Sequence, residues 1–392
     1  MPIANKMAEF IERSSWIRAM FETGAKLKAE KGAENVYDFS LGNPMLEPPE
    51  SFYQVLAQTT AQRGPGTHGY MPNSGYPQVR QKVADYLNQR DGLGFTPDDI
   101  LMTVGAAGAA NVVFKALANP GEEVVVPTPY FVEYDFYADN HGASIKRVAT
   151  NDDFSLNLEA MAEAITEKTA AVMINTPNNP TGQVYSAEEL AALADILTQA
   201  GKRLGRPIYL ISDEPYKKII FDGCEVPSIF KSYANSIVLT SFSKDLSLAG
   251  ERIGYIALNP KIEDKTQMIA AMNLANRILG FVNAPALMQK VVAELLDDSA
   301  DMNEYARKRD LFCDVLDQAG YEYVKPKGAF YIFPKCPIPD DVAFVKAAVE
   351  ECLLLVPGSG FMGPGHFRIA FCCEDAVIER SLNAFKKVRE RF

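Results

Sequence analysis

Short apolar runs alternate along the middle of the chain with segments whose apolar residues recur at helical spacing. The runs predict strands and the spaced segments predict helices, because a buried strand is short and continuous whereas a helix repeats about every 3.6 residues. Strands are predicted at 100–104, 123–126, 170–174, 207–211 and 236–240, and helices near 130–139, 157–165 and 186–201. Such alternation is typical of an α/β fold with a mostly parallel central sheet covered by helices.

The two ends of the chain carry a different pattern. Helices are predicted over 10–31 and 76–92, and two continuous helical segments are predicted between 261 and 319. Further strands are predicted near 329–333, 353–356 and 366–371, before a last helix that begins at Asp375. This mixture favours a smaller α+β domain. We therefore expect a large domain over 46–285 and a small domain formed by 1–45 and 286–392.

Composition and charge narrow the class of protein. The chain has 392 residues, of which 47% are hydrophobic and 23% charged, as in ordinary folded proteins. Its formal net charge is -11 and no dense basic run occurs, so a nucleic-acid partner is not expected. The first 15 residues interleave charged and apolar residues, and the longest apolar-looking uncharged stretch, 100–114, is shorter than a membrane helix needs. We expect a cytoplasmic protein with no membrane contact.

Cysteine and histidine usage does not indicate a metal centre. The six cysteines form no CxxC pair, and reduced thiols in a cytosol explain them best. Zinc usually takes histidines or cysteines at short, regular spacing. None of the three histidines, His68, His141 and His366, lies within helical ligand spacing of another. No metal is expected.

Small and polar residues follow each predicted strand. In an open parallel sheet the carboxyl ends of the strands meet at one edge, where ligands collect. The segments that follow the five strands are Gly105–Gly108, Pro127–Phe131, Asn175–Gly182, Ser212–Tyr216 and Ser241–Lys244. We expect these segments to share one rim of the sheet.

Several rim residues suggest a cofactor. The turn from Gly105 would aim backbone N–H groups at an anion such as phosphate, although, taken alone, a plain tight turn explains it slightly better. Lys244 near Arg252 could have a lowered pKa, as a Schiff-base amine requires, whereas most lysines are solvated surface charges. Asp213 could hold a proton on a heteroaromatic nitrogen or act as a helix cap, and Tyr216 could touch the same ligand or only pack. Together these residues describe one cofactor, pyridoxal 5'-phosphate.

Three strings make the resemblance to a family specific. The string Ser241-Phe-Ser-Lys244-Asp-Leu-Ser-Leu-Ala-Gly-Glu-Arg252-Ile-Gly254 resembles the pyridoxal-phosphate attachment site of class I/II aminotransferases of fold type I. The strings Asn175–Gly182 and Ser212–Tyr216 resemble two further signatures of that family, in the same order and spacing. The resemblance extends from Gly42 to Arg368 and implies that the large domain binds the cofactor.

The resemblance implies a role for each matched residue. Lys244 would form the Schiff base and move the proton, Asp213 would keep the ring nitrogen protonated, and Tyr216 and Asn179 would hydrogen-bond the ring oxygen. Phosphate would be held by Gly105, the Ala106 and Ala107 amides, Ser241, Ser243 and Arg252, while Phe131 would stack on the ring. Arg368, with Gly42 and Asn179, would bind the substrate α-carboxylate. Tyr70 would reach the neighbouring subunit's phosphate, which implies a homodimer with shared active sites.

The implied activity is transfer of the amino group of an L-amino acid to a 2-oxo acid, with 2-oxoglutarate expected, by a ping-pong mechanism. A C–S lyase or decarboxylase on the same fold is the alternative, because Lys244 alone does not specify the reaction. An aminotransferase-like sensor domain of a regulator is a remoter one, since it would need a DNA-binding domain for which the chain has no spare length.

Evidence on the donor conflicts. Ala107 stands where an aspartate-using subgroup has lysine, Arg277 lies near a position where another subgroup supplies a partner arginine, and Trp16 with Ile17 would suit an apolar or aromatic substrate. Asn43 stands where many relatives carry Glu, and its role is left open.

Overall fold

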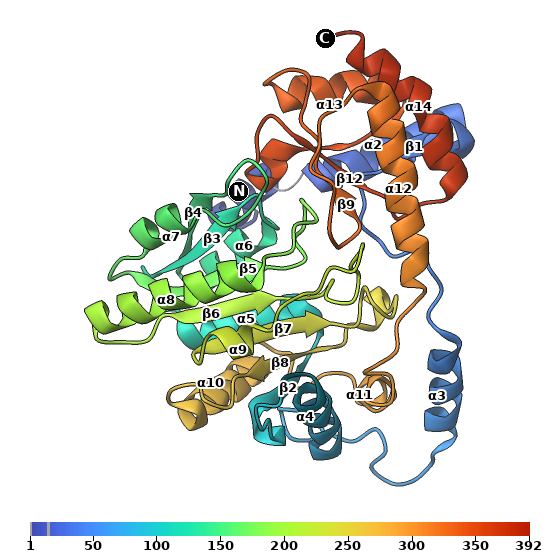
Figure 1. Ribbon diagram of the computed structural model, residues 1–392. Coiled ribbons are helices and arrows are strands. Elements are labelled where there is room, and N and C mark those ends of the chain that lie inside the picture. Colours follow the sequence, from blue (N-terminus) through green and yellow to red (C-terminus); the bar gives the residue numbers. More distant parts are fainter. Residues whose placement is uncertain (1, 14–15) are drawn as a thin grey trace.

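The computed structural model describes residues 2–13 and 16–392 (Figure 1). Within these residues the central sheet has seven strands, in the order β2-β8-β7-β6-β5-β3-β4. In chain order they are β2 (Ile100–Thr103), β3 (Glu123–Thr128), β4 (Ser144–Ala149), β5 (Thr169–Asn175), β6 (Tyr209–Asp213), β7 (Ser236–Ser241) and β8 (Gly254–Leu258). The five predicted strands are all present, each within two residues of its predicted bounds.

The direction of the strands brings the predicted rim together. Strands β4, β3, β5, β6 and β7 pair in parallel, whereas β8 is antiparallel to both of its neighbours, β7 and β2. Two antiparallel steps restore the direction, so β2 runs the same way as β7. The carboxyl ends of all five predicted strands therefore lie at one edge of the sheet.

Two strands of the sheet were not predicted. Strand β4 lies at the edge and is largely exposed, with Lys146 and Arg147 in its middle, so it has no apolar run to reveal it. Strand β8 is a buried run of five residues, which pattern alone does not separate from buried helix. The strand β6 also continues to Asp213, two residues beyond its apolar run, because its pairing with β5 extends to Asn175.

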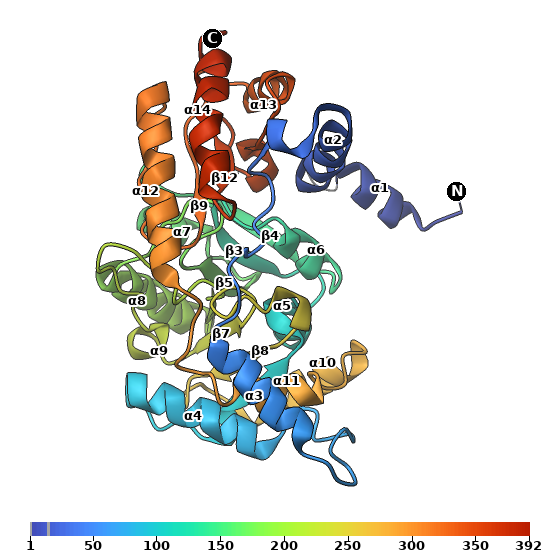
Figure 2. The ribbon, with the colours of Figure 1, turned by 90° about the vertical axis from the view of Figure 1, so that its right-hand side faces the viewer.

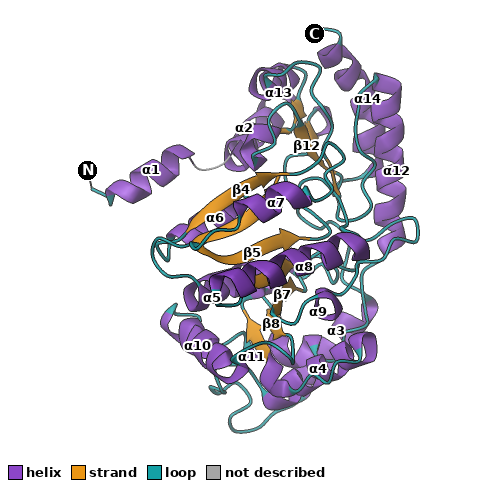
Figure 3. Cartoon of the chain, turned by 60° about the vertical axis from the view of Figure 1, so that its left-hand side comes forward, coloured by secondary structure: helices purple, strands orange, loops and turns teal. Residues whose placement is uncertain are grey.

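Helices cover both faces of this sheet, which confirms the α/β fold class (Figure 3). Successive strand residues point to opposite faces, so Val172 and Ile174 of β5 pack in one apolar cluster and Ala171 and Met173 in another. The first cluster includes residues of α4 (Pro77–Asp91), α7 (Leu158–Ala164), α8 (Ala187–Leu204), α9 (Ile229–Ser232) and α11 (Ala286–Val292). The second includes residues of α5 (Gly105–Leu117), α6 (Glu133–Asp139) and α10 (Lys265–Ile278).

Local signals explain where the helices begin and end. The Ser186 side chain accepts a hydrogen bond from the backbone N–H of Glu189, whose carboxylate accepts one from the backbone N–H of Ser186, so two N–H groups at the N-terminus of α8 are satisfied reciprocally. The helix ends at Gly205, whose φ of 67° suits the left-handed cap that glycine adopts readily.

The remaining elements form a second core from both ends of the chain (Figure 2). A small sheet contains β9 (Tyr331–Ile332), β11 (Val356–Pro357) and β12 (Phe367–Ala370), and β1 (Tyr37–Asp38) pairs in parallel with β10 (Leu353–Leu354). Around them lie α2 (Trp16–Lys31), α12 (Met302–Ala319), α13 (Asp341–Glu350) and α14 (Asp375–Arg389). The domain boundaries expected near 45/46 and 285/286 stay a prediction.

Two helical predictions differ from the structure. The segment 261–319, which is described throughout, contains three helices, α10, α11 and α12, rather than two, because Gly280 and Pro285 interrupt the first and Asp301 caps a new one. The helix expected over 10–31 corresponds to α1 (Asn5–Arg13) and α2, and the residues between these two lie outside the described part. Helix α3 (Glu50–Ala61) packs beside α11.

Aromatic packing in the second core yields a stability prediction. Phe312 is fully buried and its ring lies 4.7 Å from that of Phe39 and 5.8 Å from that of Phe385. Phe312→Ala leaves a cavity there and should lower the free energy of unfolding by about 3 to 5 kcal/mol. Urea unfolding measures this. Met45→Ala, at a side chain 57% exposed, is the control and should change it by less than about 0.5 kcal/mol; equal effects of both variants would contradict the assigned packing.

Candidate active site

A cavity of about 360 Å³ opens at the carboxyl edge of the central sheet. The predicted residues that line it are Gly42, Ala106, Ala107, Phe131, Asn179, Asp213, Tyr216, Ser241, Ser243, Lys244, Arg252 and Arg368. They come from both ends of the chain and from the ends of five strands, so the fold brings together residues that are far apart in the sequence. A larger cavity, of about 570 Å³ beside His366, contains none of the predicted residues, so size alone does not locate the chemistry.

Lys244 follows β7 and its amine points into this cavity. The Nζ atom donates a hydrogen bond to the carbonyl oxygen of Gly42 at 2.9 Å and lies 5.3 Å from the centre of the Phe330 ring. Burial lowers the pKa of Lys244 to about 8, and the cations Arg368 and Arg252 act in the same direction. An appreciable minority of the amine is therefore neutral, and nucleophilic, near physiological pH.

Asp213 ends β6 and offers an unused acceptor to the cavity. Its Oδ2 accepts a hydrogen bond of 2.5 Å from the Tyr134 hydroxyl, whereas Oδ1 is buried and has no hydrogen-bond partner among the described residues. Burial raises the pKa of Asp213 to about 7, opposed by the Tyr134 hydrogen bond and reinforced by the charge of Glu214. A buried acceptor without a partner fits a protonated ring nitrogen of a bound heterocycle.

Arg368, on β12, presents its guanidinium to the cavity between two rings. The group lies 4.6 Å from the ring centres of both Tyr331 and Phe361. It donates hydrogen bonds to the Asn179 side-chain oxygen at 3.1 Å and to the Ser40 carbonyl oxygen at 2.6 Å. Its Nε has no partner within the described part of the chain. This buried guanidinium is suited to a carboxylate, which it can bind through two donors.

Tyr216 lines the same cavity as Arg368. It forms a hydrogen bond of 3.0 Å with the Tyr331 hydroxyl. A Cβ atom at Gly42 would overlap that Tyr331 hydroxyl, so only glycine fits beside the tyrosine pair.

The N-terminus of α5 forms the anion-binding end. Gly105 begins the helix with a φ of 76°, and a Cβ atom there would lie 2.9 Å from a guanidinium nitrogen of Arg252. The hydroxyl oxygens of Ser241 and Ser243 lie 2.6 Å apart, and Arg252 donates to Ser243 at 3.4 Å. Free first-turn amides, two hydroxyls and a cation together fit a phosphate group.

Some contributors were missed in the sequence. Tyr134 holds Asp213, and its position on α6, three residues after Phe131, was the one available signal. Tyr331 and Ser40 have no such sequence signal, because both reach the site only through packing of the second core. Glu133, Tyr137 and Asn175 also line the cavity.

Other predicted residues lie away from the cavity of this chain. The Tyr70 side chain is 93% exposed, and Arg277 is exposed on α10. Asn43 is exposed and does not line the cavity. The side chains of Trp16 and Ile17 lie outside the described residues. No helix within the described part is long and apolar enough to cross a bilayer, and none of its His, Cys, Asp and Glu residues form a group of three or more able to hold a metal ion.

Comparison with known proteins assigns the family. Residues 34–385 match the family described as aminotransferase class I and II, and the chain belongs to that family. A probable aspartate/prephenate aminotransferase of Aquifex aeolicus is 30% identical over 93% of this chain and 94% of its own length.

Solved structures agree with that assignment. An aminotransferase from Eubacterium rectale has a TM-score of 0.97 and 38% identity, covering 100% of this chain and 99% of its own. An aspartate aminotransferase from Thermus thermophilus with maleate has a TM-score of 0.84 and 28% identity, covering 96% and 97%. The chain is therefore an aminotransferase, the first of the two activities that Lys244 alone left open. Enzymes of this family use pyridoxal 5'-phosphate.

The charges around Lys244 yield a prediction for the cofactor-free protein. Arg368→Met removes a buried cation that disfavours the ammonium form, so the pKa of Lys244 should rise above its wild-type value of about 8. Competitive acetylation at a series of pH values, followed by mass spectrometry of the Lys244 peptide, measures the midpoint. Arg277→Met, at an exposed arginine, is the matched control and should leave it unchanged. A downward shift in Arg368→Met would contradict the electrostatic account.

Proposed function

We propose that this aminotransferase uses pyridoxal 5'-phosphate, attached through Lys244, to move the amino group of an L-amino acid to a 2-oxo acid by a ping-pong mechanism. We take 2-oxoglutarate as the expected acceptor. One observation carries the proposal: the Lys244 amine, the unpaired Asp213 oxygen, the Arg368 guanidinium and the N-terminus of α5 line a single cavity. Each is the group that one part of this cofactor and substrate requires.

Bound pyridoxal phosphate supplies an electron sink that stabilises negative charge developing on the substrate α-carbon. The protein's part would be to keep the ring nitrogen protonated, and the Oδ1 atom of Asp213 would accept a hydrogen bond from that nitrogen. Tyr134 fixes the other carboxylate oxygen, so the carboxyl group cannot rotate freely. A cation beside Asp213 would favour its ionised form and lower its pKa from about 7.

Lys244 would act twice at the same Nζ atom. As a neutral amine it would be the nucleophile that attaches the cofactor. Once the amino acid has displaced it, it would accept the proton of the α-carbon and deliver it to the cofactor carbon on the other side of the transferred nitrogen. A base with a pKa near 8 is matched to both steps near neutral pH. The Gly42 carbonyl oxygen, 2.9 Å away, would hold the amine on the substrate side of the cavity.

The remaining residues would bind and orient. Arg368 would take the α-carboxylate, with Asn179 fixing the guanidinium and Gly42 leaving room beside it. The Tyr216 hydroxyl and Asn179 would hydrogen-bond the ring oxygen, and Phe131 would stack on the ring. Phosphate would be bound by Ser241, Ser243, Arg252, Gly105 and the Ala106 and Ala107 amides.

The donor is proposed from the cavity and the relatives together. Among the described lining residues the cations are Lys244, Arg252 and Arg368, and each already has a role. An acidic side chain would therefore need a further cation, which a second subunit can supply. Because the relatives are named for aspartate and prephenate, aspartate is the first donor to test.

A homodimer with shared active sites is part of the proposal. Tyr70 is 93% exposed, and the apolar side chains Leu274 and Ile278, one turn apart on α10, are 48% and 57% exposed beside Arg277. A second subunit on this face would cover these residues and receive Tyr70 at its phosphate end. A cytoplasmic location remains an expectation from the sequence.

A spectroscopic titration tests the reaction. Purified protein with pyridoxal phosphate should show a visible absorbance band, which one amino acid, added alone, converts to the pyridoxamine form and 2-oxoglutarate restores. Lys244→Ala should lower kcat by more than about 10³-fold, because a general base alone contributes about 10² to 10⁴. Wild-type turnover by this variant would overturn the assignment of Lys244. A persistent band with release of pyruvate from cysteine would indicate lyase chemistry instead.

Mixed dimers test the sharing of active sites. Lys244→Ala and Tyr70→Phe should each be less active alone, since each lacks one group at both sites. Co-expression should form mixed dimers in which one site has both Lys244 and the other subunit's Tyr70, restoring about half of the wild-type activity per dimer. Activity equal to the mean of the two separate variants would show that Tyr70 serves only its own chain.

A further inference from the structure

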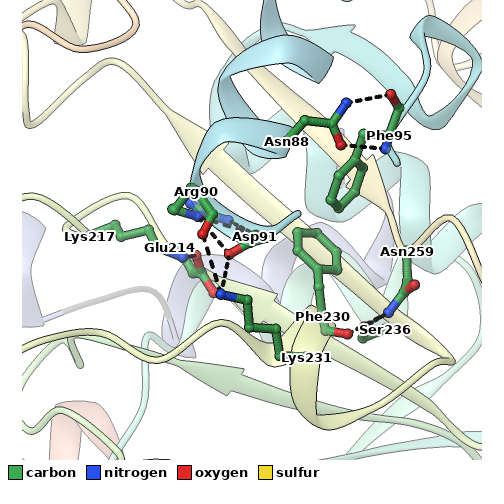
Figure 4. Close-up of polar contacts among 10 residues, drawn as sticks. All are labelled: Asn88, Arg90, Asp91, Phe95, Glu214, Lys217, Phe230, Lys231, Ser236 and Asn259. Carbon is green, nitrogen blue, oxygen red and sulfur yellow. Dashed lines mark hydrogen bonds and ion pairs between the residues drawn. The ribbon is translucent and has the colours of Figure 1, made fainter. Parts of the chain in front are cut away.

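A second group of charged side chains surrounds Glu214, and Figure 4 shows Arg90, Asp91, Lys217 and Lys231 gathered around it. Glu214 and Asp245 directly follow Asp213 and Lys244 in the chain. Both are buried, and both line a small cavity of about 30 Å³ that also contains Arg90 of α4. Asp213, in contrast, faces Tyr134 of α6, which packs on the other face of the sheet. Consecutive residues thus serve opposite faces, as the alternation of a strand requires.

Glu214 forms a tight ion pair in this second group. Its Oε2 accepts a hydrogen bond of 2.5 Å from Lys217 Nζ, and the two side chains are 1% and 19% exposed. Its Oε1 is buried without a hydrogen-bond partner in the described structure. The backbone N–H of Glu214 donates to the Leu239 carbonyl at 2.8 Å, and its carbonyl accepts from Thr240 at 3.1 Å. The carboxylate is therefore held at a fixed place behind Asp213.

Further contacts anchor the group to the surrounding helices. Arg90 is paired with Asp91 at 2.7 Å, and Lys231 approaches both of them from α9. Lys218 lies 3.8 Å from Asp245 and donates two hydrogen bonds of 2.7 Å to the carbonyls of Leu296 and Asp298. The anions and cations of the group nearly balance, so no large net charge is buried.

Stability alone is a weak explanation for this arrangement. A buried ion pair loses so much solvation that apolar residues of the same size often stabilise a fold as well. The proposed mechanism does not use Glu214 or Lys217 directly. What distinguishes the pair is its place, because Glu214 is the neighbour of the acid that meets the ring nitrogen, and its negative charge favours the protonated form of Asp213.

We propose that the Glu214–Lys217 ion pair is a positioning element that acts through the sheet on Asp213 and sets how readily this acid gives up its proton. Glu214 opposes the ionised form, and Lys217 limits that opposition by pairing with Glu214. The pair thereby adjusts how the proton is shared between Asp213 and the ring nitrogen. This inference rests on the proposed function, since the ring nitrogen is the assumed partner of Asp213.

Other titratable groups also face these side chains. Asp213 is faced by Tyr134 and Tyr137 of α6, by Tyr216 of its own loop and by Glu214, and Glu214 is faced by Lys217, Arg90, Asp245 and Tyr255. Substitution of one member of the ion pair leaves all the other groups in place, so a change in Asp213 can be assigned to the pair.

The test measures Asp213 directly in cofactor-free protein. Carboxyl carbons of aspartate are labelled with ¹³C, Asp213→Asn assigns the resonance, and NMR follows its shift with pH. Glu214→Gln should lower the midpoint of Asp213 by about 0.5 pH unit or more, because it removes a nearby buried anion. Lys217→Met should raise the midpoint, because it leaves Glu214 uncompensated. The Asp213 midpoint of the double variant should lie between those of the single variants and below that of the wild type, because Glu214 is nearer to Asp213 than Lys217 is.

Matched controls separate this coupling from a structural role. Glu294→Gln removes the same charge from the exposed Lys82–Glu294 pair, where the ions lie 2.6 Å apart, and should leave the midpoint unchanged. Shifts of both single variants in the same direction would overturn the proposal. If a single variant does not fold, the double variant, which leaves neither partner's charge unpaired, decides: an unchanged midpoint overturns the coupling.

A second measurement keeps this inference distinct from the proposed function. In pyridoxal-phosphate-loaded protein, the pH midpoint of the visible band should move as the Asp213 midpoint does. Glu214→Gln should lower it and Lys217→Met should raise it. If the two variants move the Asp213 midpoint in opposite directions but the protein forms no visible band, the coupling is supported and the proposed function is contradicted. If the band is normal and neither variant changes its pH dependence, the positioning role of the Glu214–Lys217 pair is contradicted.

Discussion

Burial of one amine and one carboxyl at the same sheet edge is the constraint on which the site depends. Removal from water disfavours the charged form of each, so the pKa of Lys244 falls to about 8 while that of Asp213 rises to about 7. Both groups become able to exchange a proton near neutral pH. Each then needs a partner that replaces water, and the Gly42 carbonyl and the Tyr134 hydroxyl fill that need.

The sheet meets this constraint through strand direction. Because β8 runs against both β7 and β2, the turn after β2, which we propose binds phosphate, lies at the edge where β6 and β7 place Asp213 and Lys244. Strand alternation then divides neighbouring residues between two tasks. One residue faces the cavity and the next enters the charged layer behind it, so a short stretch of chain supplies both a reactive group and its electrostatic background.

The sequence was informative where chemistry follows a continuous apolar run. Lys244 and Asp213 stand at the ends of such runs, and the rule that parallel strands share a carboxyl edge was enough to place them together. Tyr331 could not be placed in this way, because its contact with Tyr216 depends on how the second core packs against the central sheet. Strand β4 was not predicted because charged residues interrupt its apolar pattern. The burial of Glu214 has no sequence signal, because it depends on how distant helices pack over the sheet.

The site draws its two halves from different parts of the chain. Ser241 ends β7, and Ser243, Lys244 and Arg252 lie in the connection from β7 to β8, whereas Gly42 and Arg368 come from the terminal segments that build the second core. A substitution in the terminal segments would therefore act first on Gly42 and Arg368, and through the Gly42 carbonyl oxygen it would also reach the Lys244 amine.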